Sequence, residues 1–500
     1  MRNLKEYCGI FGIFNADDAA RKIYYGLHAL QHRGQESSGI VTSTYDENRQ
    51  RRVMQAHRDF GLVLDVFDDP AIFDTKLLGM SGIGHNRYST SGSADNASNI
   101  QPLVVHYRDG NIAIAHNGNI SNARELRNAF QERGTLFQTT SDTELILHLI
   151  AQSRRQKQID QILDALAQVE GAFSLVMLTD ESLIAVRDPN GFRPLALGRL
   201  GDPSLPGGAA YCVASETCAF DLIGAEYVRD VEPGEVLVID REGAETGSFK
   251  SHFLSQRFGV SQCVFEYVYF SRPDSKVYGE MVDKVRRKIG KQLAHESPVP
   301  KTADDDRQPI VISVPDSSNT SALGYVSECR KLGFPCRFEI GLIRNHYVGR
   351  TFISPGQDKR EMKVRCKFNT VEGVLKDRIV VIVDDSIVRG TTARYIVNMI
   401  REAGAKEVHF RVAAPPVISP CYYGMDFPSY EELFANQHGG DVDAMARWLG
   451  VDSLAYLSAD GLMSAVETAN PNAHGYCTAC FTANYPVPVE LGVTKDENDW

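Results

Sequence analysis

The chain contains 500 residues, of which 43% are hydrophobic and 23% are charged, and its formal net charge is −11. This length exceeds what one hydrophobic core supports, so we expect two or three domains. The composition is typical of a soluble globular protein, and the lack of a Lys/Arg-rich run argues against a nucleic acid partner. No apolar run reaches about eighteen residues and no basic-then-apolar leader is present, so we expect neither a membrane span nor export. The sequence predicts a cytoplasmic enzyme.

The first predicted element is a buried strand, Cys8–Phe14, whose glycines allow close approach on one side. A helix is predicted over residues 17–30, where apolar residues recur at helical spacing after two aspartates. Four polar motifs then follow in order: QHRGQ at 31–35, GHNRYST at 84–90, HNGN at 116–119 and TTSDTE at 139–144.

Each of these features has an ordinary explanation when it is taken alone. A cysteine near the start of a chain is more often buried than catalytic, and HNGN could form the turn of a β-hairpin. Asp142 could serve only as a helix cap, since Ser141 and Glu144 have the spacing of a capping box.

The order of the motifs resembles the class II glutamine amidotransferase domain of the N-terminal-nucleophile superfamily. This resemblance extends from Cys8 to about residue 245. It implies an α+β fold, an αββα sandwich, in which Cys8 is the nucleophile while Asn117 and Gly118 form the oxyanion hole. The residues that it implies for glutamine binding are Arg33, Arg87, Thr90 and Asp142.

The chemistry of this family explains why Cys8 would have to become the first residue. An internal cysteine has an amide nitrogen, which cannot accept a proton. A terminal cysteine has an α-amine with a pKa of about 7.7–8.0, which suits a general base. The thiolate could then attack the amide carbon of glutamine and form a thioester that water hydrolyses. Residues 1–7 are therefore predicted to be a propeptide.

In the second half, the segment Val380–Thr392, VVIVDDSIVRGTT, is the most informative. It is an apolar run that ends in two carboxylates and a short loop, followed by an amphipathic helix that stops at Gly404. This pattern is typical of a buried parallel strand, whose carboxyl end binds ligands in open α/β sheets. Gly390, the hydroxyls and the helix amides would hold a phosphate, and the carboxylates suit ribose or a divalent cation. The predicted ligand is a phosphorylated sugar, although a DD pair alone could be a solvated turn.

The same segment resembles the motif of type I phosphoribosyltransferases that binds phosphoribosyl pyrophosphate (PRPP), and it implies an α/β domain of that fold. The strand Ile310–Val314 and the loop Pro315–Ser318 match the pyrophosphate loop, with helices predicted at 281–295 and 321–332. The basic segment Gly341–Phe368 matches the loop that closes over PRPP, or is only solvated. The implied PRPP-binding residues are Tyr347, Arg350, Asp384, Asp385, Ser386, Arg389, Gly390, Thr391 and Thr392, and the implied ligands of one Mg²⁺ are Ser317, Asp384 and Asp385.

Together the two halves resemble the glutamine-dependent PRPP amidotransferases. The resemblance implies that ammonia released from glutamine passes through an internal channel and displaces pyrophosphate from C1 of PRPP. The products are glutamate, pyrophosphate and 5-phosphoribosylamine, in the first step of de novo purine synthesis. The predicted divisions are a propeptide 1–7, a glutaminase domain 8–245, a phosphoribosyltransferase domain 262–470 and a C-terminal segment 471–500.

Two residues of the closing loop depart from the pattern of this family. Arg344 stands where lysine is expected, and His346 stands where arginine is expected. Arginine and lysine bind phosphate differently, so these two positions are not equivalent to those of the family pattern.

Cys477 and Cys480 form a CxxC pair, which suits zinc, redox chemistry or an iron–sulfur cluster. Cys263 and Cys421 are candidates for two further ligands, but spacing alone cannot connect them, and a zinc site would fit equally well. The branch of the resembled family that has a propeptide also has a [4Fe–4S] cluster at these four positions. The resemblance therefore implies such a cluster.

Two other functions share parts of the pattern. A hexosephosphate aminotransferase has the same glutaminase half but needs sugar-isomerase domains, and a PRPP-sensing regulator needs no glutaminase. The resemblance also implies a homodimer or homotetramer that purine nucleotides inhibit, while the charge and hydropathy of the chain predict no nucleic acid or membrane partner.

Overall fold

The computed structural model describes residues 8–87, 96–205, 207–255, 258–301, 308–345, 367–425, 427–471 and 475–489. The predicted propeptide 1–7 lies outside these ranges, as do Thr90, His346, Tyr347 and Arg350. No helix of the described part is long and apolar enough to cross a membrane.

The first domain contains two antiparallel sheets. The strands of the seven-stranded sheet are, in spatial order, β11 (Glu226–Asp230), β9 (Ala196–Leu200), β10 (Ala210–Ala214), β1 (Gly9–Phe14), β4 (Ser81–Arg87), β2 (Ser37–Asp46) and β3 (Arg51–Phe60). Those of the six-stranded sheet are β13 (Lys250–Phe253), β12 (Glu235–Ile239), β8 (Leu183–Arg187), β7 (Gly171–Thr179), β6 (Gly110–Ile120) and β5 (Leu103–Tyr107).

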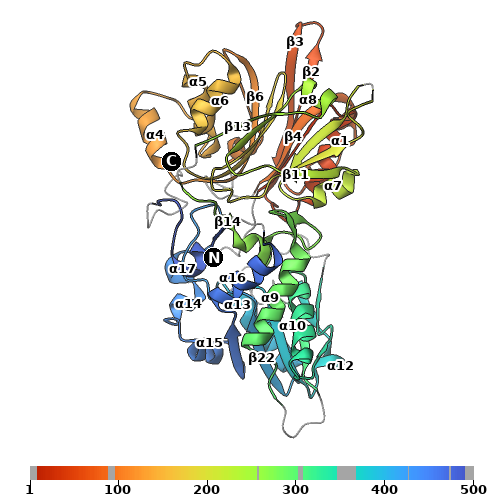
Figure 1. Ribbon diagram of the computed structural model, residues 1–500, viewed down its shortest axis with the longest axis vertical. Helices are drawn as coiled ribbons and strands as arrows, with labels where there is room; N and C mark the ends of the chain where they lie inside the picture. The colour runs from red at the N-terminus through yellow and green to blue at the C-terminus, as the bar shows by residue number, and fades with distance from the viewer. Residues whose placement is uncertain are drawn as a thin grey trace.

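Successive side chains along each strand point to opposite faces of its sheet. The two sheets and the helices that cover their outer faces therefore form four layers. In β1, Ile10 packs into the core between the two sheets, while Phe11 and Ile13 face a second core beneath the helices. The helices of the domain are α1 (Ala19–Ala29), α2 (Val63–Val66), α3 (Ala71–Thr75), α4 (Ala123–Glu132), α5 (Thr143–Gln152), α6 (Gln158–Leu166), α7 (Cys218–Ile223) and α8 (Arg241–Thr246), with a 3₁₀ turn at Ala97–Asn99. Helices α1 and α7 lie on one outer face and α4 to α6 on the other (Figure 1), which confirms the predicted αββα sandwich.

The second domain is built on a parallel sheet with the order β18-β17-β21-β22-β23. These strands are Arg337–Phe338, Ile310–Ser313, Ile379–Asp384, Glu407–Val412 and Ser453–Tyr456. Its helices are α9 (Val282–Glu296), α10 (Asn319–Lys331), α12 (Glu372–Leu375), α13 (Thr391–Glu402), α14 (Phe434–Gln437), α15 (Val442–Leu449), α16 (Ala459–Ala469) and α17 (Ala479–Thr482), with a π-helix at Glu266–Phe270 and a 3₁₀ turn at Tyr430–Glu432.

Both faces of this sheet are covered, because alternate residues of β21 enter different cores. Val381 and Val383 pack against α9, α10 and α16, whereas Val380 and Ile382 pack against α13 and α15. An apolar strand with helices on both faces is the arrangement that the VVIVDD pattern predicts. Figure 1 shows this domain stacked below the first one, with β14 (Gln262–Cys263) near the boundary.

The structure excludes one alternative interpretation of the sequence and contradicts one local prediction. HNGN is no turn, since His116–Asn119 lies inside strand β6 and is paired with β7. The capping box at Ser141 does not form, because the Glu144 carboxylate accepts hydrogen bonds from the amides of Gln138 and Thr139, at 2.8 Å each. Asp142 is the N-cap residue of α5 instead.

The two ends of the predicted closing loop form strands. Leu342–Arg344 (β19) and Phe368–Thr370 (β20) form a two-stranded antiparallel ribbon. The remaining short pairs are β14 with β24 (Tyr476–Cys477) and β15 (Lys276–Val277) with β16 (Glu280–Met281).

Candidate active sites

Cys8 lies directly before β1 in the seven-stranded sheet and is 5% exposed. Burial raises the pKa of its thiol to about 12, while the charge of Arg87 at the end of β4 opposes this shift. The thiol of the uncleaved chain is therefore protonated at neutral pH. Activation requires a nearby base, and a new α-amine would supply one.

Asn117 and Gly118 lie side by side in β6, opposite Ser174 and Phe173 of β7. The side chain of Asn117 is fully buried, and neither its Nδ2 nor its Oδ1 has a hydrogen-bond partner within the described part of the chain. A buried amide without a partner costs about 1–3 kcal/mol, so such a group indicates a ligand site. Its donor is available for an oxyanion.

Gly118 is fixed as glycine by its surroundings. A Cβ atom at this position would lie 2.0 Å from the carbonyl oxygen of Ala172 on the neighbouring strand. The absence of a side chain is what lets β6 lie this close to β7 at Gly118.

The carboxylate of Asp142 fastens the start of α5 to the end of β6. Its Oδ2 accepts a hydrogen bond from the amide of Ile120 at 3.0 Å, and its Oδ1 lies 3.5 Å from Nδ1 of His116. Asp142 and Arg87 both act electrostatically on Cys8, so the fold brings these predicted glutamine-binding residues to the nucleophile.

Arg33 lies behind the nucleophile and not in an open pocket. Its Nε donates to the carbonyl oxygen of Cys8 at 3.3 Å, and its Nη atoms donate to Glu216 and Glu266. Its side chain is fully buried. Its predicted contact with glutamine stays a prediction.

The second candidate site lies at the carboxyl end of β21. Asp384 and Asp385 are 9% and 5% exposed. Burial and the charge of Asp385 raise the pKa of Asp384 well above its usual range, and burial also raises the pKa of Asp385. A buried carboxylate pair with raised pKa values is the kind of group that a cation stabilises.

Hydroxyl groups surround this pair. Ser317 donates to Asp385 Oδ2, and Ser386 donates to Asp385 Oδ1 at 2.7 Å. Ser318, which the sequence argument did not single out, is fully buried and donates to Asp384 Oδ1 at 3.1 Å and to Asp385 Oδ2 at 3.3 Å. The sequence feature that could have identified Ser318 is its position next to Ser317 in the loop after β17.

The loop after these carboxylates leads into the start of α13. Gly390 has a φ of +72°, and a Cβ atom there would lie 2.6 Å from the ring of Phe434, so only glycine fits. Thr391 and Thr392 open the helix with exposed side chains, beside the free amides of its first turn. Arg389 pairs with Glu432 at 3.4 Å, and Arg344 at the base of the closing loop pairs with Asp316 at 3.2 Å.

The four cysteines converge where the two ends of the second domain meet. Cys263 and Cys477 are register partners in the parallel pair β14–β24. The Sγ of Cys421 accepts hydrogen bonds from the amides of Tyr423 and Met425, at 3.4 and 3.3 Å. Burial raises the pKa values of Cys263, Cys477 and Cys480, and the neighbouring thiols raise them further. Within the described residues, no three His, Cys, Asp or Glu side chains lie close enough to hold a single metal ion.

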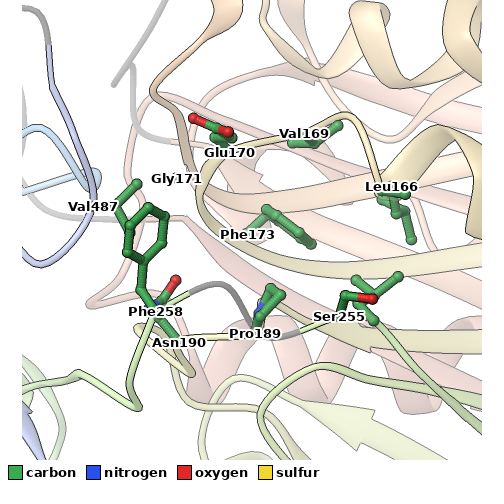
Figure 2. Close-up of a pocket in the computed structure, with 12 residues that line it drawn as sticks. Leu166, Val169, Glu170, Gly171, Phe173, Pro189, Asn190, Ser255, Phe258 and Val487 are labelled. Atoms are coloured by element: carbon green, nitrogen blue, oxygen red, sulfur yellow. The ribbon is translucent and has the colours of Figure 1, made fainter.

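A cavity of about 140 Å³ lies beside β7, the strand that pairs with Asn117 and Gly118. Figure 2 shows its mainly apolar lining, which includes Phe173, Phe258 and Val487. It contains none of the predicted site residues.

Comparison with known proteins agrees with both halves of this arrangement. Residues 85–221 match the family model of the glutamine amidotransferase domain. The chain is 47% identical to amidophosphoribosyltransferase 1, chloroplastic, of Arabidopsis thaliana, over 99% of this chain and 81% of that protein. It is 44% identical to the amidophosphoribosyltransferase of Bacillus subtilis, over 98% of this chain and 96% of that protein.

Solved structures agree over the whole length. Glutamine PRPP amidotransferase from B. subtilis, complexed with ADP and GMP, superposes with a TM-score of 0.84 at 43% identity, covering 97% of this chain and 99% of that one. A structure described as the allosteric regulatory enzyme of purine biosynthesis gives a TM-score of 0.86 at 42% identity, with 99% of each chain covered. The chain therefore belongs to the amidophosphoribosyltransferase family, and it is a glutamine amidotransferase and pentosyltransferase that forms 5-phosphoribosylamine from glutamine and PRPP in purine biosynthesis.

Proposed function

We propose that glutamine is hydrolysed at Cys8 and that PRPP is aminated at the loop Asp384–Thr392. The observation that carries the first assignment is the buried amide of Asn117, whose donor has no partner in the described part of the chain. The second rests on the buried carboxylates beside a glycine-led helix start. We also propose the division into residues 1–7, 8–245, 262–470 and 471–500.

At the first centre, removal of residues 1–7 would free the α-amine of Cys8 to take the proton of its thiol. The thiolate attacks the amide carbon of glutamine, and the amides of Asn117 and Gly118 donate to the oxygen that becomes negative. Ammonia leaves with the transferred proton, and water hydrolyses the thioester to glutamate. Arg87 and Asp142 suit the α-carboxylate and α-ammonium groups of glutamine, with Arg33 and Thr90 in support.

At the second centre, ammonia forms a bond to C1 of PRPP, pyrophosphate leaves with the electrons of the C1–O bond, and the nitrogen loses a proton. Ser386, Arg389, Gly390, Thr391 and Thr392 would bind the 5-phosphate, and Asp384 and Asp385 the ribose hydroxyls. Tyr347 and Arg350 are proposed to contact PRPP from the closing loop. Ser317, Asp384 and Asp385 fit one Mg²⁺, which when bound would neutralise charge on the diphosphate.

We propose that Cys263, Cys421, Cys477 and Cys480 hold a [4Fe–4S] cluster, as the family resemblance implies. The other three thiols act electrostatically on Cys480, so the four side chains converge in the fold. Amide donors to Cys421 and apolar walls are features that tune such clusters. When bound, the cluster would join the two ends of the second domain.

Three further features are proposed from the family. The enzyme would be a cytoplasmic homodimer or homotetramer, and purine nucleotides would inhibit it. The B. subtilis structure, described as complexed with ADP and GMP, supports the last point.

Measuring phosphoribosylamine with glutamine and then with ammonia as donor tests the assignment. Cys8→Ala should lose only the glutamine-dependent rate, because ammonia bypasses the first centre. Asp384→Asn should reduce both rates. Equal loss with both donors in Cys8→Ala would overturn the division of labour.

A further inference from the structure

The carboxylate of Glu266 joins the two domains at a buried point. Glu266 follows β14 in the chain and is 0% exposed. It accepts hydrogen bonds from Arg33 Nη2 at 2.9 Å, from Arg193 Nη1 at 3.3 Å and from Ser271 Oγ at 2.6 Å. Both guanidinium groups come from the first domain. One side chain of the second domain therefore holds two arginines of the glutaminase.

The first of these arginines, Arg33, contacts the backbone of the nucleophile. Arg33 Nη1 also lies 3.3 Å from Glu266 Oε2, so the pair is bidentate, and the guanidinium lies 4.3 Å from the ring centre of Phe270. These contacts hold the guanidinium group of Arg33 in one orientation. Its Nε donates to the carbonyl oxygen of Cys8 at 3.3 Å. A shift of Glu266 is thus transmitted to the backbone of Cys8.

The second arginine, Arg193, contacts a loop that packs against the oxyanion hole. Arg193 Nη2 donates to the carbonyl oxygen of Tyr423 at 2.7 Å. The next residue, Gly424, packs so closely that a Cβ atom on it would lie 3.1 Å from the carbonyl carbon of Gly118. Asn119 Nδ2 fastens the same loop by donating to the Tyr422 carbonyl at 2.8 Å. The loop 422–424 therefore backs the strand that carries Asn117 and Gly118.

The network pairs two buried guanidinium groups, those of Arg33 and Arg193, with the buried carboxylates of Glu216 and Glu266. Glu216 of the first domain accepts in turn from the second domain, from Arg272 N at 2.9 Å and from Ser275 Oγ at 2.7 Å. Although burial opposes it, His32 and Arg33 hold the pKa of Glu216 well below its usual range. Loss of the Glu266 charge would leave two buried arginines facing one carboxylate, which is costly.

We propose that Glu266 is a positioning residue for glutamine hydrolysis, supplied by the phosphoribosyltransferase half. It sets the distance between the Cys8 nucleophile and the oxyanion hole, through Arg33 on one side and Arg193 on the other. This role rests on the proposed function of Cys8, Asn117 and Gly118. It touches neither substrate nor reacting atoms.

The test is a comparison of Glu266→Gln and Glu266→Asp in the full-length, processed enzyme. Glutamine keeps the shape but loses the charge and one acceptor, whereas aspartate keeps the charge. A misplacement of about 1 Å in a reacting group can cost about 10²-fold in rate. We expect kcat for glutamine to fall by about 10²-fold in Glu266→Gln with KM changed less than about threefold, and Glu266→Asp to recover part of it. The ammonia-dependent rate should stay within about twofold of wild type.

A second readout separates positioning from general damage. Alkylation of Cys8 by iodoacetamide needs the thiolate but no oxyanion hole. Its rate in Glu266→Gln should therefore stay within about threefold of wild type while glutamine hydrolysis collapses. Ser275→Ala is the matched control, because it removes a buried interdomain hydrogen bond to Glu216 but breaks neither arm. It should keep full glutaminase activity.

If Glu266→Gln does not fold, Arg193→Lys tests the oxyanion arm alone, because lysine has a single nitrogen in place of the two Nη atoms that contact Glu266 and Tyr423 separately. It should lower kcat for glutamine and spare alkylation. A wild-type kcat for glutamine in either folded variant overturns the proposal, and so does an equal loss of the ammonia-dependent rate. Glutamine-dependent activity that survives in Cys8→Ala would instead overturn the proposed function.

Discussion

Replacing Asn117 by leucine should stabilise the protein while abolishing most of its glutaminase activity. The amide of Asn117 is 0% exposed, and its two polar atoms have no partner in the described residues. Leucine has the same number and branching of side-chain heavy atoms, but it buries no polar group. Removing a buried polar group without a partner should gain about 1–3 kcal/mol.

The expected shift follows from the size of the first domain. For a domain of this length, about 1 kcal/mol corresponds to roughly 2 °C in Tm, so Asn117→Leu should raise the first transition by roughly 2–6 °C. Loss of one oxyanion donor should lower kcat for glutamine by about 10²–10³-fold. The ammonia-dependent rate should not change.

The assay combines thermal denaturation of the processed enzyme with phosphoribosylamine formation from each nitrogen donor. Asn117→Ala serves as a comparison, because it removes the same amide but leaves a small void that offsets the gain. A lower Tm in Asn117→Leu, together with retained glutamine-dependent activity, would show that Asn117 is a structural residue.

Three further outcomes are expected. A chain that keeps residues 1–7 should lack glutamine-dependent activity and keep ammonia-dependent activity, because the thiol pKa of about 12 leaves Cys8 protonated. Full glutamine-dependent activity of the uncleaved chain would contradict this prediction. The folded structure raises the pKa values of Asp384 and Asp385, so their contribution to stability is present below the unfolded pKa of about 4 and is lost as pH rises through the folded values. Mg²⁺ with PRPP should therefore raise Tm more at pH 8 than at pH 5. The substitution Asp384→Asn should remove this difference. Anaerobically purified protein should be brown with about four iron atoms per chain, and Cys421→Ser should lose them; colourless protein with bound zinc would refute the cluster.

Local patterns in the sequence predicted the elements around the PRPP site well. The apolar run before Asp384 and the helical spacing after Gly390 depend on neighbours in the chain, and α13 ends at Glu402, before Gly404 with its φ of +85°. The sequence alone left a turn open as an alternative for HNGN, because Asn-Gly is also the favoured pair of a tight turn. The close approach of Ala172, which keeps the segment in a strand, comes from another part of the chain.

The partners of the site residues could not be predicted in the same way. Arg33 was expected to face glutamine, but Glu266, 233 positions away, holds its guanidinium. No spacing rule connects residues so far apart. Likewise, the pairing of β14 with β24 joins Cys263 to Cys477, which the CxxC spacing could not do.

This same pairing sets an order of events during synthesis. Cys263 leaves the ribosome long before its neighbour on β24, and at about 5–20 residues per second the interval to Cys477 is roughly 10–40 s. During that time strand β14 lacks its pairing with β24, and its thiol has no companion from the C-terminal segment. Whatever group the four thiols hold together therefore cannot be bound by a chain that ends before Cys477, even when the first domain and the PRPP loop are already made.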